Sequence, residues 1–364
     1  MWTTPDVPRQ DLPPLPPSEE VETPAVLKAV IAASRELSAL KVACSRLPDP
    51  AILINTIPLL EAQASSEIEN IVTTNDELFR AVHNASDQPI TPAVKEALRY
   101  RQAIRIASDL LAERPLGVPT ALEVCTQIRG IQARIRDHAG TFIGNPQTKE
   151  RIYTPPEGRE VITRHLGLWE DFLHRDHGID PLVVMALQHY QFEAIHPFSD
   201  GNGRTGRVLN MLTLMDKELL RDPVLYLSGY IVRHKQDYYS LLRGVTERDE
   251  WEPWILFMVS ACEVTAKWTL ELIETITAMQ TEVEGRIRTL VPRAPAADLA
   301  RLLFTQPYVR IENITEAGYA QRQAASRWLS DLVRAGILGE EKIGRGKIFI
   351  NNALLDTLFE TPLA

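Results

Sequence analysis

Apolar residues recur at intervals of three and four positions over most of the chain, which predicts a protein built mainly from helices. Val26, Leu27, Val30 and Ile31 show this spacing near the start of a helical stretch from about 24 to 80. Further helices are expected at about 91–112, 120–137, 161–174, 181–195, 203–220, 237–246 and 251–288. The predicted fold class is therefore all-α.

Prolines divide the N-terminal part of this pattern. Pro48, Pro50 and Pro58 lie inside the first helical stretch, and we expect several short helices there because proline interrupts the helical hydrogen bonds. Seven of the first 25 residues are also proline, so the run 12–17 should be extended and polyproline-like. We favour a strap over the first domain, and a ligand for an SH3-type domain is the alternative.

Two segments depart from the helical pattern and predict small β-structures. Residues 139–158 contain two short runs around a polar turn, which predicts an exposed hairpin flap at 141–156 with an edge open to another extended chain. After a linker at 292–295 that contains two prolines, residues 296–364 combine two amphipathic segments with a hairpin around a glycine turn. We interpret this last segment as a winged helix-turn-helix.

The composition narrows the classes of protein. The chain has 364 residues, 45% hydrophobic and 24% charged, which is typical of a folded protein with two or three domains. Its net charge of −9 argues against a global binder of nucleic acid or anionic membranes. No stretch reaches the roughly 20 apolar residues of a membrane span, and the first residues do not form a signal peptide. Cys44, Cys125 and Cys262 form no disulfide or zinc pattern. We expect a cytoplasmic protein that does not bind membranes.

The segment with the most chemical information is 196–207, which lies between two strongly apolar helices. Gly201 and Gly203 allow backbone N–H groups to approach a bulky anion, and the helix that begins there directs its positive end to the same place. Arg204 and Arg207 are three residues apart on that helix, so both guanidinium groups can reach phosphate oxygens. The segment therefore predicts a phosphate-binding loop.

Two further residues of this segment are suited to a metal ion and to proton transfer. Asp200 supplies a hard oxygen ligand for a Mg²⁺ ion that bridges two phosphates. His196 ends the preceding helix before Pro197, and an imidazole with a pKa near 6.5 can accept a proton from an attacking hydroxyl. A structural glycine-rich turn with solvated arginines is the alternative, but it does not explain why so many unusual residue types occur together.

The segment resembles the signature of the Fic family, HPFx[D/E]GNGRxxR, and matches it at every fixed position from His196 to Arg207. The resemblance implies an all-α Fic core that transfers AMP from ATP to a Ser, Thr or Tyr hydroxyl of a protein, with Mg²⁺. By position, it implies the following roles: His196 as general base, Asp200 as Mg²⁺ ligand, Gly201, Asn202 and Gly203 as the anion hole, Arg204 as a phosphate ligand and Arg207 as the γ-phosphate ligand.

A second motif, farther upstream, resembles the inhibitory helix of many Fic proteins, [S/T]xxxE[G/N]. Ser65 and Glu69 are four residues apart on one helical face, and Asn70 is suited to end a helix. The resemblance implies that Glu69 pairs with Arg207 and displaces the γ-phosphate from a productive position. A chance match is the alternative, because so short a pattern occurs in roughly a third of chains of this length.

The resemblance also extends to the flap and to the nucleobase. Ile152 and Tyr153 would dock a target segment by strand addition, and Tyr239 would contact adenine. Thr246 stands where some relatives have an asparagine that contacts the base. A purely structural hairpin and a packing tyrosine are the alternatives. His189, seven residues before the signature, is expected to be a core histidine.

The C-terminal segment balances eight basic residues against eight acidic ones. Its expected recognition helix carries Arg322, Arg327 and Arg334, and its wing adds Arg345 and Lys347. This basic face is weaker than the stripe that tight binding to a phosphate backbone needs. Weak DNA contact, protein contact and self-association as a homodimer all stay open.

The expected domains are a strap (1–20), an N-terminal helical domain with the inhibitory helix (21–95), the Fic core (96–290) and the winged-helix-like domain (296–364). The leading functional prediction is an autoinhibited protein adenylyltransferase, with its own chain among its targets. The alternatives are transfer of another phosphate-containing group, removal of AMP from modified proteins, and a DNA-binding regulator that uses the core as a nucleotide sensor.

Overall fold

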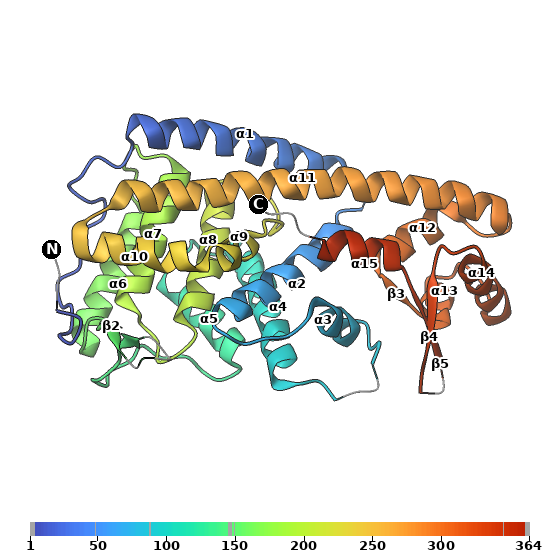
Figure 1. The fold of residues 1–364 in the computed structure, drawn as a ribbon, viewed down its shortest axis with the longest axis horizontal. Helices are drawn as coiled ribbons and strands as arrows, with labels where there is room; N and C mark the ends of the chain where they lie inside the picture. The colour runs from blue at the N-terminus through green and yellow to red at the C-terminus, as the bar shows by residue number, and fades with distance from the viewer. Residues whose placement is uncertain are drawn as a thin grey trace.

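The computed structural model describes residues 4–47, 49–86, 89–144, 148, 150–344 and 346–360, and these residues are mainly helical, as predicted (Figure 1). Pro48, Arg345 and part of the predicted flap turn lie outside the described residues.

The N-terminal part contains α1 (Pro24–Arg46), α2 (Ala51–Ile68), α3 (Asn75–Val82) and α4 (Pro92–Leu111). The central part contains α5 (Val118–Arg129), β1 (Ile143–Gly144), β2 (Arg151–Tyr153), α6 (Arg159–His174), α7 (Pro181–Ile195), α8 (Asn202–Asp216), α9 (Leu227–Arg233), α10 (Lys235–Arg248) and α11 (Trp251–Leu290). The C-terminal part contains α12 (Ala296–Thr305), β3 (Tyr308–Val309), α13 (Ile311–Glu316), α14 (Arg322–Arg334), β4 (Gly339–Ile343), β5 (Gly346–Ile350) and α15 (Asn352–Phe359).

Three helices begin with the same local arrangement, a capping side chain followed by proline. Thr23, Thr91 and Asp180 precede α1, α4 and α7, and each side-chain oxygen accepts a hydrogen bond from a backbone N–H two or three residues ahead. Because proline needs no hydrogen-bond partner at the first helical position, the pair fixes the start of the helix. The predicted bounds of α7 agree with the structure for this reason.

The helix predictions fail where proline or glycine acts differently from expectation. Pro58 lies inside α2 and does not end it, because α2 is packed between α4 and α9 and this packing offsets the lost hydrogen bond. The helix expected over 120–137 ends at Arg129, where Gly130 adopts a left-handed φ of +68°. The short elements α9, β3, α13 and α15 are absent from the predictions, because so few residues do not show a full period.

The longest helix, α11, organises the molecule. It runs along one edge beside α1 and reaches from the strap side to the C-terminal part (Figure 1). α7 packs against α11 and α8, and α7 and α8 are buried along most of their lengths. The loop between α7 and α8 is therefore held on a rigid support. None of the helices in the described part of the chain is long and apolar enough to cross a membrane.

The proline-rich N-terminal segment lies beside the flap and α6. The N–H of Arg9 donates to the carbonyl of Thr154 at 2.9 Å, directly after β2. The carbonyl of Gln10 lies 2.8 Å from Nε2 of His165 on α6. The segment thus lies across the surface next to β2 and α6 in the central part of the chain (Figure 1), and not over the first helical domain as the sequence predicted.

The C-terminal part docks on the N-terminal helices. Its three strands form an antiparallel sheet in the order β3-β5-β4, and β4 with β5 is the predicted hairpin. Phe359 packs edge-on against Phe79 of α3, with ring centroids 5.5 Å apart, and Tyr308 donates a hydrogen bond to Asp76 at 2.6 Å. The residues predicted as a linker, 292–295, are therefore a short turn between packed helices and not a spacer between separate bodies.

Candidate functional site

The segment 196–207 forms the loop between α7 and α8 and the first turns of α8. α7 ends at Ile195, the next residue, His196, has a left-handed φ of +49°, and Gly201, with a φ of +84°, precedes α8. Glycine adopts this conformation readily, whereas for histidine it costs energy. The first N–H groups of α8 have no partners within their own helix, as at any helix start, and face this loop.

The side chain of Asn202 closes the loop. Its Oδ1 accepts a hydrogen bond from the N–H of Phe198, and its Nδ2 donates to the carbonyl of Phe198, both at 2.8 Å. Asn202 is buried. The asparagine of the predicted anion hole thus uses its side chain to hold the loop and leaves its backbone N–H for a ligand.

Arg136 fixes the position of His196 from outside the signature. Its Nε donates to the carbonyl of His196 at 2.7 Å, and its Nη2 donates to the carbonyls of Ile195 and Pro156. The backbone N–H of Arg136 also donates to the carbonyl of Pro197 at 2.9 Å. Sequence analysis missed this residue because it lies in a stretch expected to be helical and matches no motif.

The imidazole of His196 is half-buried. Burial and the positive charge of Arg136 lower its pKa to about 4, against a weaker opposite effect of Glu69, so the ring is neutral near pH 7. The backbone of Glu193 also acts against this shift. A neutral imidazole has one ring nitrogen with a free lone pair, which is what a proton acceptor needs.

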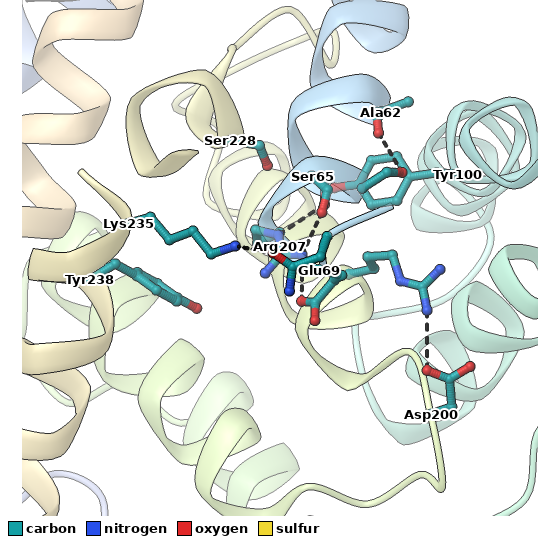
Figure 2. A network of polar contacts seen from close by, with 12 residues as sticks. Ala62, Ser65, Glu69, Tyr100, Asp200, Arg207, Ser228, Lys235 and Tyr238 are labelled. Carbon is teal, nitrogen blue, oxygen red and sulfur yellow. Dashed lines mark hydrogen bonds and ion pairs between the residues drawn. The ribbon is translucent and has the colours of Figure 1, made fainter. Parts of the chain in front are cut away.

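Arg207 makes the contacts predicted for the inhibitory motif (Figure 2). The residue is 2% exposed. Its Nε donates to Oγ of Ser65, and its Nη2 donates to the carbonyl of Ser65, both at 2.9 Å. Nη2 also donates to Oε1 of Glu69 at 2.9 Å, which forms an ion pair. The structure therefore brings the upstream motif and the signature together, although 138 residues separate Glu69 from Arg207.

Arg204 lies one turn earlier on α8 and is 3% exposed. It forms an ion pair with Glu96 of α4 and a second one, at 3.2 Å, with Oδ1 of Asp200. Glu96 is another residue that the sequence did not indicate. Two buried guanidinium groups thus lie on one side of the start of α8, as the spacing of three residues predicts.

Glu69 lies against the glycine-rich start of α8. It follows the last residue of α2, and Asn70, with a left-handed φ of +62°, ends the helix as predicted. A Cβ atom at Gly203 would collide with Oε1 of Glu69. Burial opposes ionisation of Glu69, but the charge and hydrogen bonding of Arg207, aided by Arg204, outweigh it and lower the pKa. An ionised carboxylate therefore lies where the sequence predicts an anion.

Asp200 tests whether the site fits Mg²⁺. Its side chain is 61% exposed, and Oδ2 lies 3.6 Å from Nε of Arg129. One exposed carboxylate is the kind of donor that Mg²⁺ uses together with substrate phosphates and water. The described residues contain no cluster of three or more His, Cys, Asp or Glu that could hold a metal ion. The residues present thus fit Mg²⁺ as part of a metal–nucleotide complex.

The predicted adenine contact and its neighbours differ in exposure. Tyr239 is 43% exposed, whereas Tyr238 is buried, with its hydroxyl 2.8 Å from Nε2 of His189. His189 is therefore a core residue, as expected. Thr246 lies 3.1 Å from the hydroxyl of Tyr190. Of the two adjacent tyrosines, Tyr239 is the one that a ligand can reach.

The predicted flap is present as the antiparallel pair β1 and β2, while residues 145–147 and 149 of its turn lie outside the described residues. Tyr153 is buried, and its hydroxyl donates to the carbonyl of Ala194 at 2.8 Å, two residues before His196. Ile152 is half-buried. The side chain of Tyr153 thus anchors the flap on α7, and the N-terminal segment is hydrogen-bonded to the chain directly after β2.

Glu193 is a further acidic residue that the sequence did not indicate, half-buried as a residue but with an inaccessible Oε1. It lies on α7, and burial raises the pKa of its carboxyl to about 8, although Arg207 opposes the shift. Its Oε1 has no hydrogen-bond partner within the described residues. A protonated carboxyl is therefore present next to α8 near pH 7.

Comparison with protein-family models gives three matches. Residues 27–109 match the Fic/DOC family N-terminal model, and residues 123–214 match the Fic/DOC family model. Residues 279–354 match a model described as the C-terminal domain of SoFic-like protein adenylyltransferase. The chain belongs to the Fic family, as its signature predicts.

Curated proteins and solved structures agree with this assignment. The chain is 30% identical over 172 residues to "Protein adenylyltransferase Fic" of Drosophila virilis and 29% identical over 140 residues to that of Culex quinquefasciatus. These alignments cover 43% and 37% of this chain but 33% and 27% of the relatives, so the chain spans about a third of their length.

Two solved structures show the same fold. A Fic family protein from Desulfovibrio desulfuricans G20 has a TM-score of 0.57 and 17% identity, over 94% of this chain and 98% of that one. Fic-1 from C. elegans has a TM-score of 0.54 and 21% identity, over 69% of this chain and 75% of that one. The mainly helical fold is thus a Fic fold.

Proposed function

We propose that this protein is an adenylyltransferase that moves AMP from ATP to Ser, Thr or Tyr hydroxyls of proteins, its own chain included. The observation that carries this proposal is the buried pair Arg204 and Arg207, at a glycine-rich helix start beside the neutral imidazole of His196. The family assignment and the printed names of the curated relatives support it.

His196 acts as the general base. It takes the proton of the attacking hydroxyl while that oxygen forms a bond to the α-phosphorus of ATP. The bond from the α-phosphorus to its bridging oxygen breaks, and pyrophosphate leaves with the electron pair. Arg136 keeps the ring in place through the carbonyl of His196. The protein contributes positioning and charge stabilisation and forms no covalent intermediate.

The triphosphate binds at the start of α8. Backbone N–H groups of Gly201, Asn202 and Gly203 face its α- and β-phosphates. The two guanidinium groups bind the phosphate oxygens, Arg207 at the γ-phosphate. Mg²⁺ held through Asp200 would neutralise charge on the phosphates. The exposed ring of Tyr239 stacks on adenine.

The ion pair between Glu69 and Arg207 is the inhibited state of this site. The carboxylate takes one guanidinium donor and the space beside Gly203, and its negative charge repels a γ-phosphate. Ser65 holds the same guanidinium group in place with two further hydrogen bonds. Asn70 ends the helix so that the chain turns away after Glu69.

We further propose the domain division 1–20, 21–95, 96–290 and 296–364 and a target segment that adds to β2 at Ile152 and Tyr153. The order helix, strand, helix, helix, hairpin supports a winged helix-turn-helix in the last domain. This domain is the candidate for a weak contact with DNA, another protein or a second copy. Three buried free cysteines are consistent with the cytoplasm.

Intact-mass analysis tests the proposed reaction. We expect Glu69→Gly to gain the mass of AMP when incubated with ATP and Mg²⁺, and no nucleotide mass when incubated with UTP. The double variant Glu69→Gly with His196→Ala is the control and should gain nothing. A gain of UMP or of a single phosphate would replace this function by another, and no gain with any nucleotide would contradict it.

A further inference from the structure

We infer that Glu61 is a positioning residue that holds the inhibitory end of α2, and with it Glu69, over Arg207. The inference rests on the proposed inhibition by Glu69. Glu61 lies on α2, about two turns before Glu69, and is 2% exposed. It belongs neither to the signature nor to the inhibitory motif.

The carboxylate of Glu61 connects α2 to two other helices. Its Oε2 accepts a hydrogen bond from the backbone N–H of Ser228 on α9 at 2.9 Å, and its Oε1 accepts one from Oγ of Ser228 at 2.5 Å. The hydroxyl of Tyr100 on α4 donates to Oε1 at 3.4 Å. Ser228 and Tyr100 are buried and lie close to Ser65 (Figure 2). One side chain thus fixes α2 against the two helices that enclose it.

These hydrogen bonds set the position of α2 along its axis. Burial without a hydrogen-bonded cation raises the pKa of Glu61 to about 7, against the opposite effects of Ser228, Arg207 and Tyr100. A buried carboxyl without partners is costly in either protonation state. Because its partners lie at one place, a shift of α2 along its axis would leave the group unsatisfied. A single buried polar group can fix a helix register in this way.

A second hydrogen bond connects the end of α2, beyond Glu69, to the segment that contains α9 and α10. Nζ of Lys235, the first residue of α10, donates to Oδ1 of Asn70 at 3.0 Å, and Figure 2 shows Lys235 reaching toward this end of α2. α9 and α10 are consecutive along the chain, so both contacts come from one continuous stretch. Glu61 and Asn70 therefore hold α2 on either side of Glu69, from the segment that also carries Tyr239.

Hydrogen–deuterium exchange of the full chain without nucleotide tests the inference directly. In Glu61→Ala and Ser228→Ala we expect residues 62–70 to exchange roughly tenfold faster than in the wild type. Glu61→Gln keeps an acceptor for the N–H of Ser228 and should stay close to the wild type. Thr265→Val, which alters a buried hydroxyl on α11, is the matched control.

Unchanged exchange at 62–70 in both Glu61→Ala and Ser228→Ala would overturn the inference. Equal acceleration over the whole chain, α14 included, would overturn it as well, because it would show a general loss of stability. If residues 62–70 exchange as fast in Glu61→Gln as in Glu61→Ala, the charge of Glu61 matters and not the position of an acceptor.

The transfer assay separates this inference from the proposed function. Glu61→Ala should raise AMP transfer several-fold when Glu69 is present and leave it unchanged in Glu69→Gly, because Glu61 acts only through Glu69. An equal effect in both backgrounds would contradict the inference. If Glu69→Gly itself transfers nothing, the proposed function fails, while the exchange experiment still decides whether Glu61 holds α2.

Discussion

Two pairs of arginines show how differently this protein uses one side chain. Arg204 and Arg207 on α8 are 3% and 2% exposed and are enclosed by carboxylates and hydroxyls of other helices. The side chains of Arg322 and Arg334 on α14 are 72% and 78% exposed, and each forms an ion pair with one nearby carboxylate. Both pairs lie on helices, but only the first is buried and only its members are three residues apart.

The difference explains which region is suited to a small anion. A charge removed from water needs a full set of fixed partners, and the anion that supplies them is bound strongly. An exposed ion pair contributes little and is screened by salt. In the proposed function the α8 pair binds phosphate oxygens, and Glu69 is already ion-paired to Arg207, whereas the exposed α14 pair is suited to a weak contact at most.

The largest expected effect comes from removing the proposed base beside the buried pair. His196→Ala in the Glu69→Gly background should lower AMP transfer by at least about 100-fold, because it removes the proposed acceptor of the hydroxyl proton. Calorimetry should show ATP binding retained, since the arginines are intact. Transfer that survives in this variant would refute the assignment of the base.

The next effect compares the two arginine pairs by stability. Arg207→Ala leaves Glu69 and the carbonyl of Ser65 without their partner and should lower the free energy of unfolding by about 3–5 kcal/mol in urea. Arg334→Ala is the matched control and should change it by less than about 0.5 kcal/mol. Equal losses of unfolding free energy in the two variants would contradict the claim that burial distinguishes the two pairs of arginines.

A smaller effect, dependent on pH, separates the carboxyl group of Glu61, buried on α2, from that of Glu69, half-buried just after α2. Glu69 has an ion-pair partner and a lowered pKa, whereas the pKa of Glu61 is raised from 4.5 to about 7. The folded state then holds the proton of Glu61 more tightly than the unfolded state, so its stability falls as pH rises from about 4.5 to about 7.

Glu61→Gln cannot titrate and should escape this loss. We measure the free energy of unfolding in urea at about pH 5 and at about pH 8. From the lower to the higher pH, the variant should gain on the order of 3 kcal/mol relative to the wild type. If the difference in unfolding free energy between the variant and the wild type is the same at both pH values, Glu61 does not titrate in this window.

Sequence reasoning reached those parts of the site that lie on one local pattern. The glycines and arginines of 196–207 lie on one loop and the first turns of one helix, so their spacing was sufficient to predict that they come together. Ser65 and Glu69 were found from a short motif, and the structure brings them to Arg207. Arg136 and Glu61 could not be found in this way, because each acts through contacts with distant segments that no spacing encodes.

The fold shows the same limit. α7 was predicted at its observed bounds because Asp180 and Pro181 mark its start and Pro197 follows its end. Pro58 gave a false break, because tertiary packing on both sides of α2 outweighs the local preference. The docking of the C-terminal part on α3 depends on contacts such as that of Phe359 with Phe79, which only the folded chain brings together.

The central claim is that the carboxylate of Glu69 occupies the place of a phosphate at Arg207, and its most direct test is the initial rate of AMP transfer by intact mass. Glu69→Gly should exceed the wild type by at least about tenfold at the same concentrations of ATP and Mg²⁺. Glu67→Gly controls for the effect of a glycine near the end of α2 and should stay near the wild-type rate. A rate for Glu69→Gly at or below that of the wild type would contradict the claim.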